Sequence, residues 1–399
     1  MLSVCFYFHM HQPYRVRRYR IFDIGHHHDY FAAHDDSDLN NEKILHKVAA
    51  KCYRPAGEMF RDILRDHPDF RFALSITGTL VEQLQAYDPE TLKLYQELVA
   101  TGRVEIVAET YYHSLAFLYS KSEFVRQVRL HKAMVERVFG YTPRVFRNTE
   151  LIYTNSLAEW ADSVGYKAIF AEGWDPILGW RAPTFPYKPV GTENIKALLK
   201  HYKLSDDIAF RFGDRNWVEY PVTAEKFASW VHAYHGNGNT VNLFMDYETF
   251  GEHQWADKGI FEFMRALPAA LKTNPDTTFK TPSETADAYG AVGQIDVPHV
   301  LTWADTERDL SAWIGNDMQK TALEETYALE ERVLRSGSEQ IIDDWRKLQT
   351  SDHFYYMCTK YFNDGDVHAY FNPYANPYEA YIAHKNALED LTERVKRYT

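Results

Sequence analysis

Two carboxylates stand at the ends of short strand-like segments and could work together as a catalytic pair. Glu150 ends the stretch VFRNTE at 145–150, and Asp246 follows the apolar run 241–245. Two carboxyl groups that face one cavity form the acid and the nucleophile of glycoside hydrolysis, about 5–5.5 Å apart for retention and about 6.5–9.5 Å apart for inversion. From the residues alone, metal ligands and structural ion pairs are alternatives.

Two charged neighbours could tune this pair. Arg147 lies three residues before Glu150, and its guanidinium could hold Glu150 ionised, as a nucleophile requires. Glu248 lies two residues after Asp246 and could raise the pKa of Asp246, as an acid catalyst requires.

Other polar residues could bind a substrate nearby. His9 and His11 leave the first apolar run two residues apart, so both imidazoles lie on one face of a strand and could hydrogen-bond sugar hydroxyls without a metal. A pair of hydrogen-bonded loop histidines is the alternative. Glu105 lies inside the apolar run 102–107, where a buried carboxylate needs partners or a function.

Aromatic residues near position 300 are candidates for stacking on sugar rings. Trp303, Asp305 and Trp313 offer two aromatic faces and a carboxylate for hydroxyl groups. The alternative is that both tryptophans only pack a helical region against the rest of the chain. No acidic loop of the EF-hand kind is present in the sequence, so we expect neither an obligatory metal nor a cofactor.

The elements that must position these residues alternate between strands and helices. Strands are expected at 2–8, 70–76, 104–108, 145–146, 168–170, 208–212, 241–245 and 278–279, and helices at 41–65 with a break near Pro55, 80–98, 121–139 and 156–164. This alternation predicts parallel β/α units, arranged either as a barrel or as a doubly wound sheet, and a barrel would carry its active site at the carboxyl ends of the strands. The helical patterns at 318–334, 341–348 and 381–398 predict a helical module, so we expect a β/α domain at 1–299 and an α-helical domain at 300–399 that completes the cleft.

Composition narrows the class of partner. The net charge of −12 argues against a nucleic acid or an anionic membrane. Three cysteines without metal-site spacing, and no apolar run of about 18 residues, predict a soluble, reduced, cytoplasmic protein. Aromatic residues make up 15% of the chain, which suits a sugar-binding cleft. The sequence predicts no oligomeric state.

Five short regions, in fixed order, resemble glycoside hydrolase family 57, and most of all its α-amylase-type members. They are His11-Gln12-Pro13, 102–107, the block ending in Glu150, 246–253 and 281–284. The resemblance implies an α/β fold, an incomplete (β/α)7 barrel with a C-terminal helical module. It implies a retaining mechanism with Glu150 as nucleophile and Asp246 as general acid/base. It also places His11 and Glu105 at a sugar subsite, and we add Glu248 and His253 of the fourth region as substrate-binding candidates.

We therefore predict a retaining α-amylase that cleaves α-1,4-glucosidic bonds in starch, glycogen or maltooligosaccharides. A 4-α-glucanotransferase or branching activity would use the same carboxylates, because only the acceptor differs. A metal-dependent polysaccharide deacetylase and a non-catalytic glycan-binding protein are the remaining alternatives.

Overall fold

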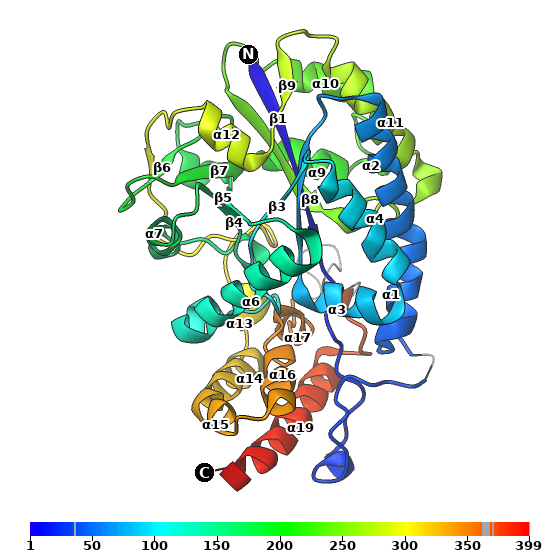
Figure 1. The fold of residues 1–399 in the computed structure, drawn as a ribbon, viewed down its shortest axis with the longest axis vertical. Helices are drawn as coiled ribbons and strands as arrows, with labels where there is room; N and C mark the ends of the chain where they lie inside the picture. The colour runs from blue at the N-terminus through cyan, green and yellow to red at the C-terminus, as the bar shows by residue number, and fades with distance from the viewer. Residues whose placement is uncertain (36, 361–367, 369–370, 399) are drawn as a thin grey trace.

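The first strand, β1 (Leu2–Met10), lies at the centre of the fold. The computed structural model describes residues 1–35, 37–360, 368 and 371–398. All nine residues of β1 are buried, as expected for a parallel strand covered on both faces. It pairs in parallel with β2 (Phe72–Ile76), β8 (Thr240–Asp246) and β9 (Thr277–Phe279), and Figure 1 shows it running down the upper part of the molecule.

The parallel strands form a ring of which β1 is a member. The remaining ring strands are β3 (Val104–Ile106), β4 (Val145–Phe146), β5 (Ala168–Glu172) and β7 (Lys196–Lys200). Within the described residues, seven strands follow one another as β1-β2-β3-β4-β5-β7-β8. Two neighbouring pairs of strands in this ring, β3 with β4 and β7 with β8, are joined by few backbone hydrogen bonds. Ala108 joins β3 to β4 by donating to Val145 O at 2.8 Å, and the His201 N–H joins β7 to β8 by donating to Asn242 O at 2.9 Å. The predicted incomplete (β/α)7 barrel is confirmed.

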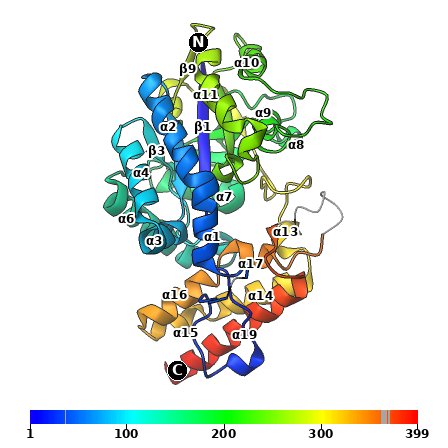
Figure 2. The ribbon, with the colours of Figure 1, turned by 90° about the vertical axis from the view of Figure 1, so that its right-hand side faces the viewer.

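Helices cover the outside of the ring. They are α1 (Asn41–Val48), a π-helical segment (Ala49–Tyr53), α2 (Arg54–Asp66), α3 (Gly78–Tyr87), α4 (Pro89–Ala100), α5 (Ala116–Tyr119), α6 (Lys121–Phe139), α7 (Asn155–Ser163), α8 (Asp175–Leu178), α9 (Tyr202–Ala209), α10 (Ala224–His232), α11 (Ile260–Leu271) and α12 (Pro282–Ala288). Figure 2 shows α1 and α2 running along β1. The N-cap of α6 is Ser120, whose hydroxyl accepts from the Glu123 N–H, and the helix ends at left-handed Gly140.

Some expected elements were wrong. The range 208–212, predicted as a strand, belongs to the end of α9 and the turn after it. Ile208, in the last turn of α9, and Phe212, in the turn after the helix, are both buried in the outer core. The strand at this point of the ring is instead β7, which the prediction missed, together with the short pair of β6 (Lys188–Pro189) and β10 (Gln294–Ile295).

Two helical boundaries also differ. The range 80–98 is two helices, because the Asp88 side chain accepts from the Thr91 N–H and starts α4, with Pro89 in its first turn. The described backbone of 41–66 is helical throughout, so the expected break near Pro55 is absent. An irregular π-helical segment, Ala49–Tyr53, stands just before Pro55 instead.

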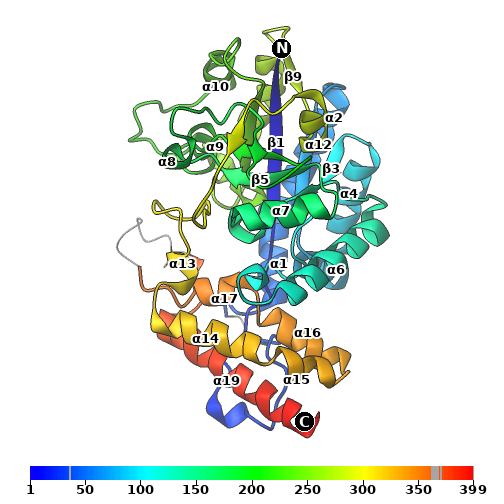
Figure 3. The same ribbon diagram turned by 90° about the vertical axis from the view of Figure 1, so that its left-hand side faces the viewer.

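The helices after the barrel form a module at one end of it. They are α13 (Ser311–Ile314), α14 (Asp317–Ala328), α15 (Glu330–Arg335), α16 (Glu339–Lys347), α17 (Ser351–Tyr355) and α19 (Pro377–Val395). Figure 3 shows them at the carboxyl end of β1, away from the N-terminus. The loop after β1 runs down to this module, where the Gly25 N–H donates to Asp390 at 2.6 Å.

One continuous core joins the module to the barrel. Phe146 and Ile169 of the barrel belong to the same buried cluster as Trp345 and Leu388 of the module. The helical C-terminal region is therefore confirmed, while the boundary between 299 and 300 stays a prediction. Among the described residues, no helix is long and apolar enough to cross a membrane.

Candidate active site

A cavity of about 760 Å³ lies where the carboxyl ends of the barrel strands meet the helical module. Its walls come from the ends of β1 and β8, from α9, from the segment 303–313 and from α17. Both predicted catalytic carboxylates, Glu150 and Asp246, line it. The carboxyl end of the strands is where barrel enzymes of this kind carry their active sites.

Glu150 lies on a short 3-10 turn after β4 and is held in an uncommon conformation. Its backbone is left-handed, with φ 55° and ψ 28°, which costs free energy for a residue other than glycine. His113 Nε2 donates to Oε1 at 3.0 Å, and the Trp303 indole Nε1 donates to Oε2 at 2.7 Å. Burial raises the pKa of Glu150, but the bond and charge of His113 outweigh it and hold the pKa below its usual value. The group is therefore ionised at neutral pH.

Asp246 ends β8 and stands beside His9 of β1, its partner in the parallel register. Its side chain is 41% exposed, and Oδ1 lies 3.6 Å from His9 Nδ1. Burial raises the pKa of Asp246, but the hydrogen bond and charge of His9 lower it more. The expected raised pKa of Asp246 is therefore wrong for the free protein. The raised value belongs to Glu248, whose pKa rises to about 8 through burial and the charge of Asp246.

A buried charge cluster lies beneath the two carboxylates. Glu109 Oε2 accepts from His9 Nε2 at 3.2 Å and lies 3.5 Å from Arg147 Nη1. Burial raises the pKa of Glu109, but His9, His113 and Arg147 lower it well below its usual value. From the sequence, Arg147 was expected to pair with Glu150, and this expectation was wrong. Arg147 pairs with Glu109 instead, because its side chain is fully buried under the cavity. Its charge still reaches Glu150 through space.

Helix α17 of the module supplies the carboxylate of Asp352 to the cavity. His11 Nε2 bonds Asp352 Oδ2 of α17 at 2.9 Å, and His11 Nδ1 bonds Thr77 Oγ1 at 2.9 Å. Burial and the charge of His113 lower the pKa of His11 to about 4, so its imidazole is neutral at pH 7. The ring of His113 lies against both other histidines, with centroids 4.2 Å from His11 and 4.7 Å from His9.

Glu105 does not reach the cavity. It faces the barrel interior, as Val107 and Glu109 do, because alternate residues of a strand share a face. However, it sits near the amino end of β3, and its Oε2 accepts from the Ser283 N–H of α12 at 2.9 Å. Placing Glu105 at the sugar subsite is therefore wrong in this structure. Glu109, four residues further along the same face, occupies the carboxyl end.

The remaining candidates lie around the cavity, where sugar contact stays a prediction. Trp303, Asp305, Trp313, Glu248 and His253 all line it. Trp313 is only 1% exposed, so it lies mostly in the packing between barrel and module. Asp305 accepts from His368 Nε2 at 3.1 Å, and the His253 ring lies 5.5 Å from that of Phe371.

Sequence reasoning missed several residues that the fold brings here: Glu109, His113, Glu172, Lys200 and Asp352. Four of them had a usable signal. Glu109 and His113 follow β3, and Glu172 and Lys200 are the last residues of β5 and β7. Asp352 had no such signal, because it lies 341 residues from His11 in the chain.

Two groups in the described residues have the donor types of a metal site: His9, Glu109 and His113, and His11, His113 and Asp352, each with ligand atoms within 4.8 Å of one another. His113 belongs to both. Burial lowers its pKa, but the bonds to Glu109 and Glu150 outweigh this and raise it to about 9. Without a metal, His113 therefore carries a proton on each nitrogen at neutral pH. A metal ion could bind in either group only by displacing a proton from His113.

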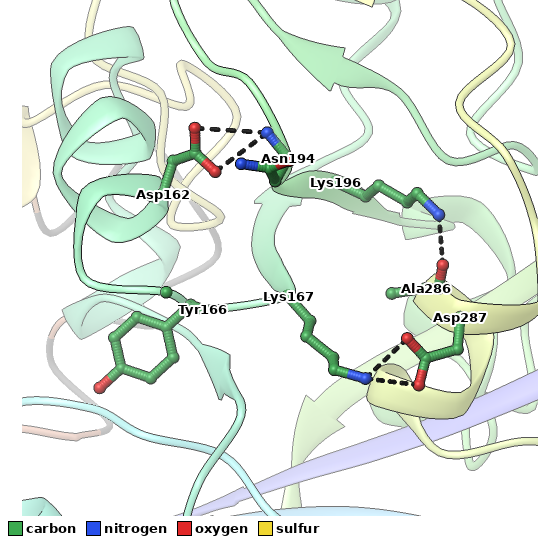
Figure 4. Close-up of a pocket in the computed structure, with 8 residues that line it drawn as sticks. Asp162, Tyr166, Lys167, Asn194, Lys196, Ala286 and Asp287 are labelled. Atoms are coloured by element: carbon green, nitrogen blue, oxygen red, sulfur yellow. Dashed lines mark hydrogen bonds and ion pairs between the residues drawn. The ribbon is translucent and has the colours of Figure 1, made fainter.

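A second, smaller hollow of about 190 Å³ lies at the amino ends of β5 and β7 (Figure 4). Its charged groups bind one another or the backbone. Lys167 Nζ bonds both oxygens of Asp287, at 2.8 and 2.7 Å, and Lys196 Nζ donates to Tyr289 O at 2.7 Å. Asp162 accepts from backbone N–H groups. Charges compensated in this way indicate a structural role.

The barrel, the strand-end carboxylates and the helical module together indicate a glycosidase-type protein. Sequence comparison shows the family to which it belongs. The profile of glycosyl hydrolase family 57 matches residues 5–298, and the chain belongs to that family. It is an enzyme family that acts on glycosidic bonds.

Among its relatives, a Methanocaldococcus jannaschii protein named "Putative alpha-amylase" is 40% identical over 406 residues, or 99% of this chain and 85% of that protein. A Pyrococcus horikoshii alpha-amylase is 27% identical over 41% of this chain and 25% of its own length.

Solved structures show the same fold. A family 57 branching enzyme from Thermococcus kodakaraensis superposes with a TM-score of 0.70 at 16% identity, covering 99% of this chain and 91% of its own. An alpha-amylase from Thermotoga maritima gives a TM-score of 0.62 at 16% identity, covering 100% and 94%. A 4-alpha-glucanotransferase from Thermococcus litoralis gives a TM-score of 0.64 at 17% identity, and the match covers 89% of this chain and 56% of that protein.

Proposed function

We propose that this protein is a retaining α-amylase that hydrolyses α-1,4-glucosidic bonds in starch, glycogen or maltooligosaccharides. The observation that carries the proposal is the environment of Glu150. An ionised carboxylate with a donor on each oxygen faces a cavity that it shares with Asp246. An activated carboxylate opposite a second carboxyl group is what double displacement at a sugar requires.

The first step joins the sugar to the protein. Glu150 attacks the anomeric carbon, and protonated Asp246 gives its proton to the departing glycosidic oxygen. Asp246 must first gain that proton. Its side chain is 41% exposed in the free protein, and a bound sugar would displace the water around it. Loss of hydration disfavours the charged form and raises the pKa of a carboxyl group.

The second step releases the sugar. Asp246, now ionised, takes a proton from a water molecule whose oxygen attacks the anomeric carbon. The bond to Glu150 breaks, and Glu150 leaves as a carboxylate that His113 and Trp303 stabilise. Two displacements at one carbon restore the α configuration of the product.

The other polar groups of the cavity suit a neutral substrate. Neutral His11 bonds Thr77 and Asp352 through its two ring nitrogens and so orients the Asp352 carboxylate, which can accept a further hydrogen bond from a hydroxyl group. Cations in the cluster are matched by carboxylates, as in the pairing of Arg147 with Glu109. Sugar hydroxyls bind such groups without bringing a charge that would have to be compensated.

The test uses maltoheptaose with wild type, Glu150→Gln and Asp246→Asn. Both variants keep the side-chain volume, so folding can be matched by circular dichroism. We expect each to lose more than about 1,000-fold in kcat, and we expect the first product of the wild type to be the α anomer by proton NMR. A rate above a tenth of wild type in either variant, or a β anomer released first, would overturn the proposal.

Transfer to a sugar is the second candidate, and the comparisons favour keeping it. Relatives and structural neighbours include proteins named 4-alpha-glucanotransferase and branching enzyme. The same maltoheptaose reaction separates the two, because hydrolysis yields only shorter chains while transfer also yields longer ones. Full activity after exhaustive chelation would exclude the metal-dependent deacetylase. Tight binding of maltoheptaose without turnover would instead indicate a glycan-binding protein.

A further inference from the structure

We propose that Trp303 is a positioning residue that fixes the carboxylate of Glu150, in addition to any contact it makes with sugar. This inference rests on the proposed function, in which Glu150 is the nucleophile. It gives Trp303 a role in the rate of the first step, whereas a stacking platform would act on affinity.

Trp303 holds Glu150 at two points. Its indole Nε1 donates to Oε2 of the carboxylate at 2.7 Å, and its backbone N–H donates to the Glu150 carbonyl oxygen at 3.3 Å. The neighbouring bridge between Tyr153 and Leu301 keeps the two segments side by side. Because Trp303 hydrogen-bonds both the backbone and the side chain of Glu150, it restrains the rotamer of Glu150.

The ring of Trp303 is itself fixed by cations. The Arg147 guanidinium lies 5.4 Å from the ring centroid, and Lys200 Nζ lies 5.5 Å from it. Both are within the range of a cation–π contact. Lys200 is bound to Asp206 at 3.0 Å and to Glu172 at 3.3 Å, so its head group is also restrained.

The loop that carries Trp303 is tied back on itself. The Arg308 side chain donates to the carbonyl oxygens of Trp303 and Asp305. Asp305 and Arg308 both have a φ of 54°, in the left-handed region that non-glycine residues rarely occupy. Arg308 also lies 3.8 Å from Glu172. Backbone strain of this kind persists only where surrounding contacts impose it.

These contacts have one chemical consequence. Together with His113 on Oε1, Trp303 on Oε2 gives the carboxylate a donor on each oxygen. Hydrogen bonds to the charged form favour that form. The pair therefore keeps Glu150 ionised and oriented against the repulsion of Asp246 across the cavity.

Trp303→Phe separates positioning from stacking, because it keeps an aromatic ring and removes only the donor and part of the ring. We expect kcat on maltoheptaose to fall about 10- to 100-fold, with KM within about threefold, as for loss of a charge-assisted hydrogen bond. Since the bond lowers the pKa of Glu150, we expect the acidic limb of kcat/KM to move to higher pH by roughly one unit.

Trp180→Phe is the matched control, because Trp180 is 89% exposed and does not line the cavity. We expect wild-type kcat, KM and pH profile from it. A Trp303→Phe variant that changes KM alone and leaves the acidic limb in place would overturn the proposal, since that is the behaviour of a stacking platform.

A measurement without substrate keeps this test distinct from the proposed function. The chain has nine tryptophans, and nitrogen-15 labelling of their indoles gives resolvable N–H signals by NMR. The signal that Trp303→Phe removes should shift in Glu150→Gln and stay in place in Trp180→Phe. An unshifted signal would overturn the positioning role even if maltoheptaose is cleaved, while a shifted signal without cleavage would overturn only the proposed function.

Discussion

Replacing His113 by glutamine should remove a pH-dependent part of the protein's stability. His113 is 1% exposed and lies between Glu109, at 3.5 Å, and Glu150, at 3.0 Å. Although burial lowers its pKa, the two carboxylates raise it to about 9 from the ordinary 6.5. At about 1.36 kcal/mol for each unit, this difference corresponds to roughly 3 kcal/mol.

The sign follows from proton linkage. Because the folded-state pKa lies above the unfolded-state value, this stabilisation is complete below about pH 6.5 and is lost as the pH rises through about 9. Urea unfolding of wild type and His113→Gln at pH 6, 8 and 9.5 measures it. The free-energy gap between the two proteins should shrink by roughly 3 kcal/mol across this range. Circular dichroism and fluorescence must give the same transition for these free energies to apply.

A second buried histidine provides the control. His353 bonds the Lys347 carbonyl oxygen, and burial lowers its pKa to about 3, so it is neutral throughout the tested range. Because only the unfolded imidazole of His353 is protonated at pH 6, wild type should lose somewhat under about 1 kcal/mol relative to His353→Gln as the pH falls from 9.5 to 6, a change opposite in sign to that of His113→Gln. A gap for His113→Gln that stays constant, or that changes with the sign of the His353 control, would refute the charged imidazole between two carboxylates.

Two further variants test other parts of the cavity. Asp352→Asn removes the charged partner of His11 and should raise KM for maltoheptaose about 10-fold, with an unchanged fold by circular dichroism, whereas an unchanged KM would contradict a role of the module in binding. Glu248→Gln resembles the protonated form that a pKa of about 8 maintains, so activity at pH 6 should stay within about threefold of wild type. Because burial raises that pKa above its unfolded value, wild type loses stability as pH rises to about 8 while the variant does not, and identical pH–stability curves would contradict this.

Local patterns were enough to predict most of the elements. Helix α6 was predicted with its observed bounds, because Ser120 caps one end and Gly140 closes the other. The carboxylates Glu150 and Asp246 were predicted from strand ends alone. Each of these depends on neighbours within a few residues, which the sequence displays directly.

How deeply a residue lies in the barrel, and which groups it contacts, could be seen only in the folded chain. Glu105 of β3 and Glu109, just after it, point to the same side of the chain, and only the position of the strand ends in the ring decides which of them lies beneath the cavity. The helical end of α9 was misread as a strand because a short apolar run fits either period.

The amino-acid sequence by itself determined the parallel β/α pattern, the positions of the two carboxylates and the helical tail, because apolar periodicity and strand-end residues are local properties, and the barrel was implied by the resemblance to a family. The tertiary structure decided which groups surround those carboxylates. Asp352 meets His11 across 341 residues, and Trp303 reaches Glu150 across 153. The protonation state of a carboxyl group depends on burial and on charges a few ångströms away. Those neighbours come from distant parts of the chain, so the ionised Glu150 and the proton on Glu248 follow only from the fold.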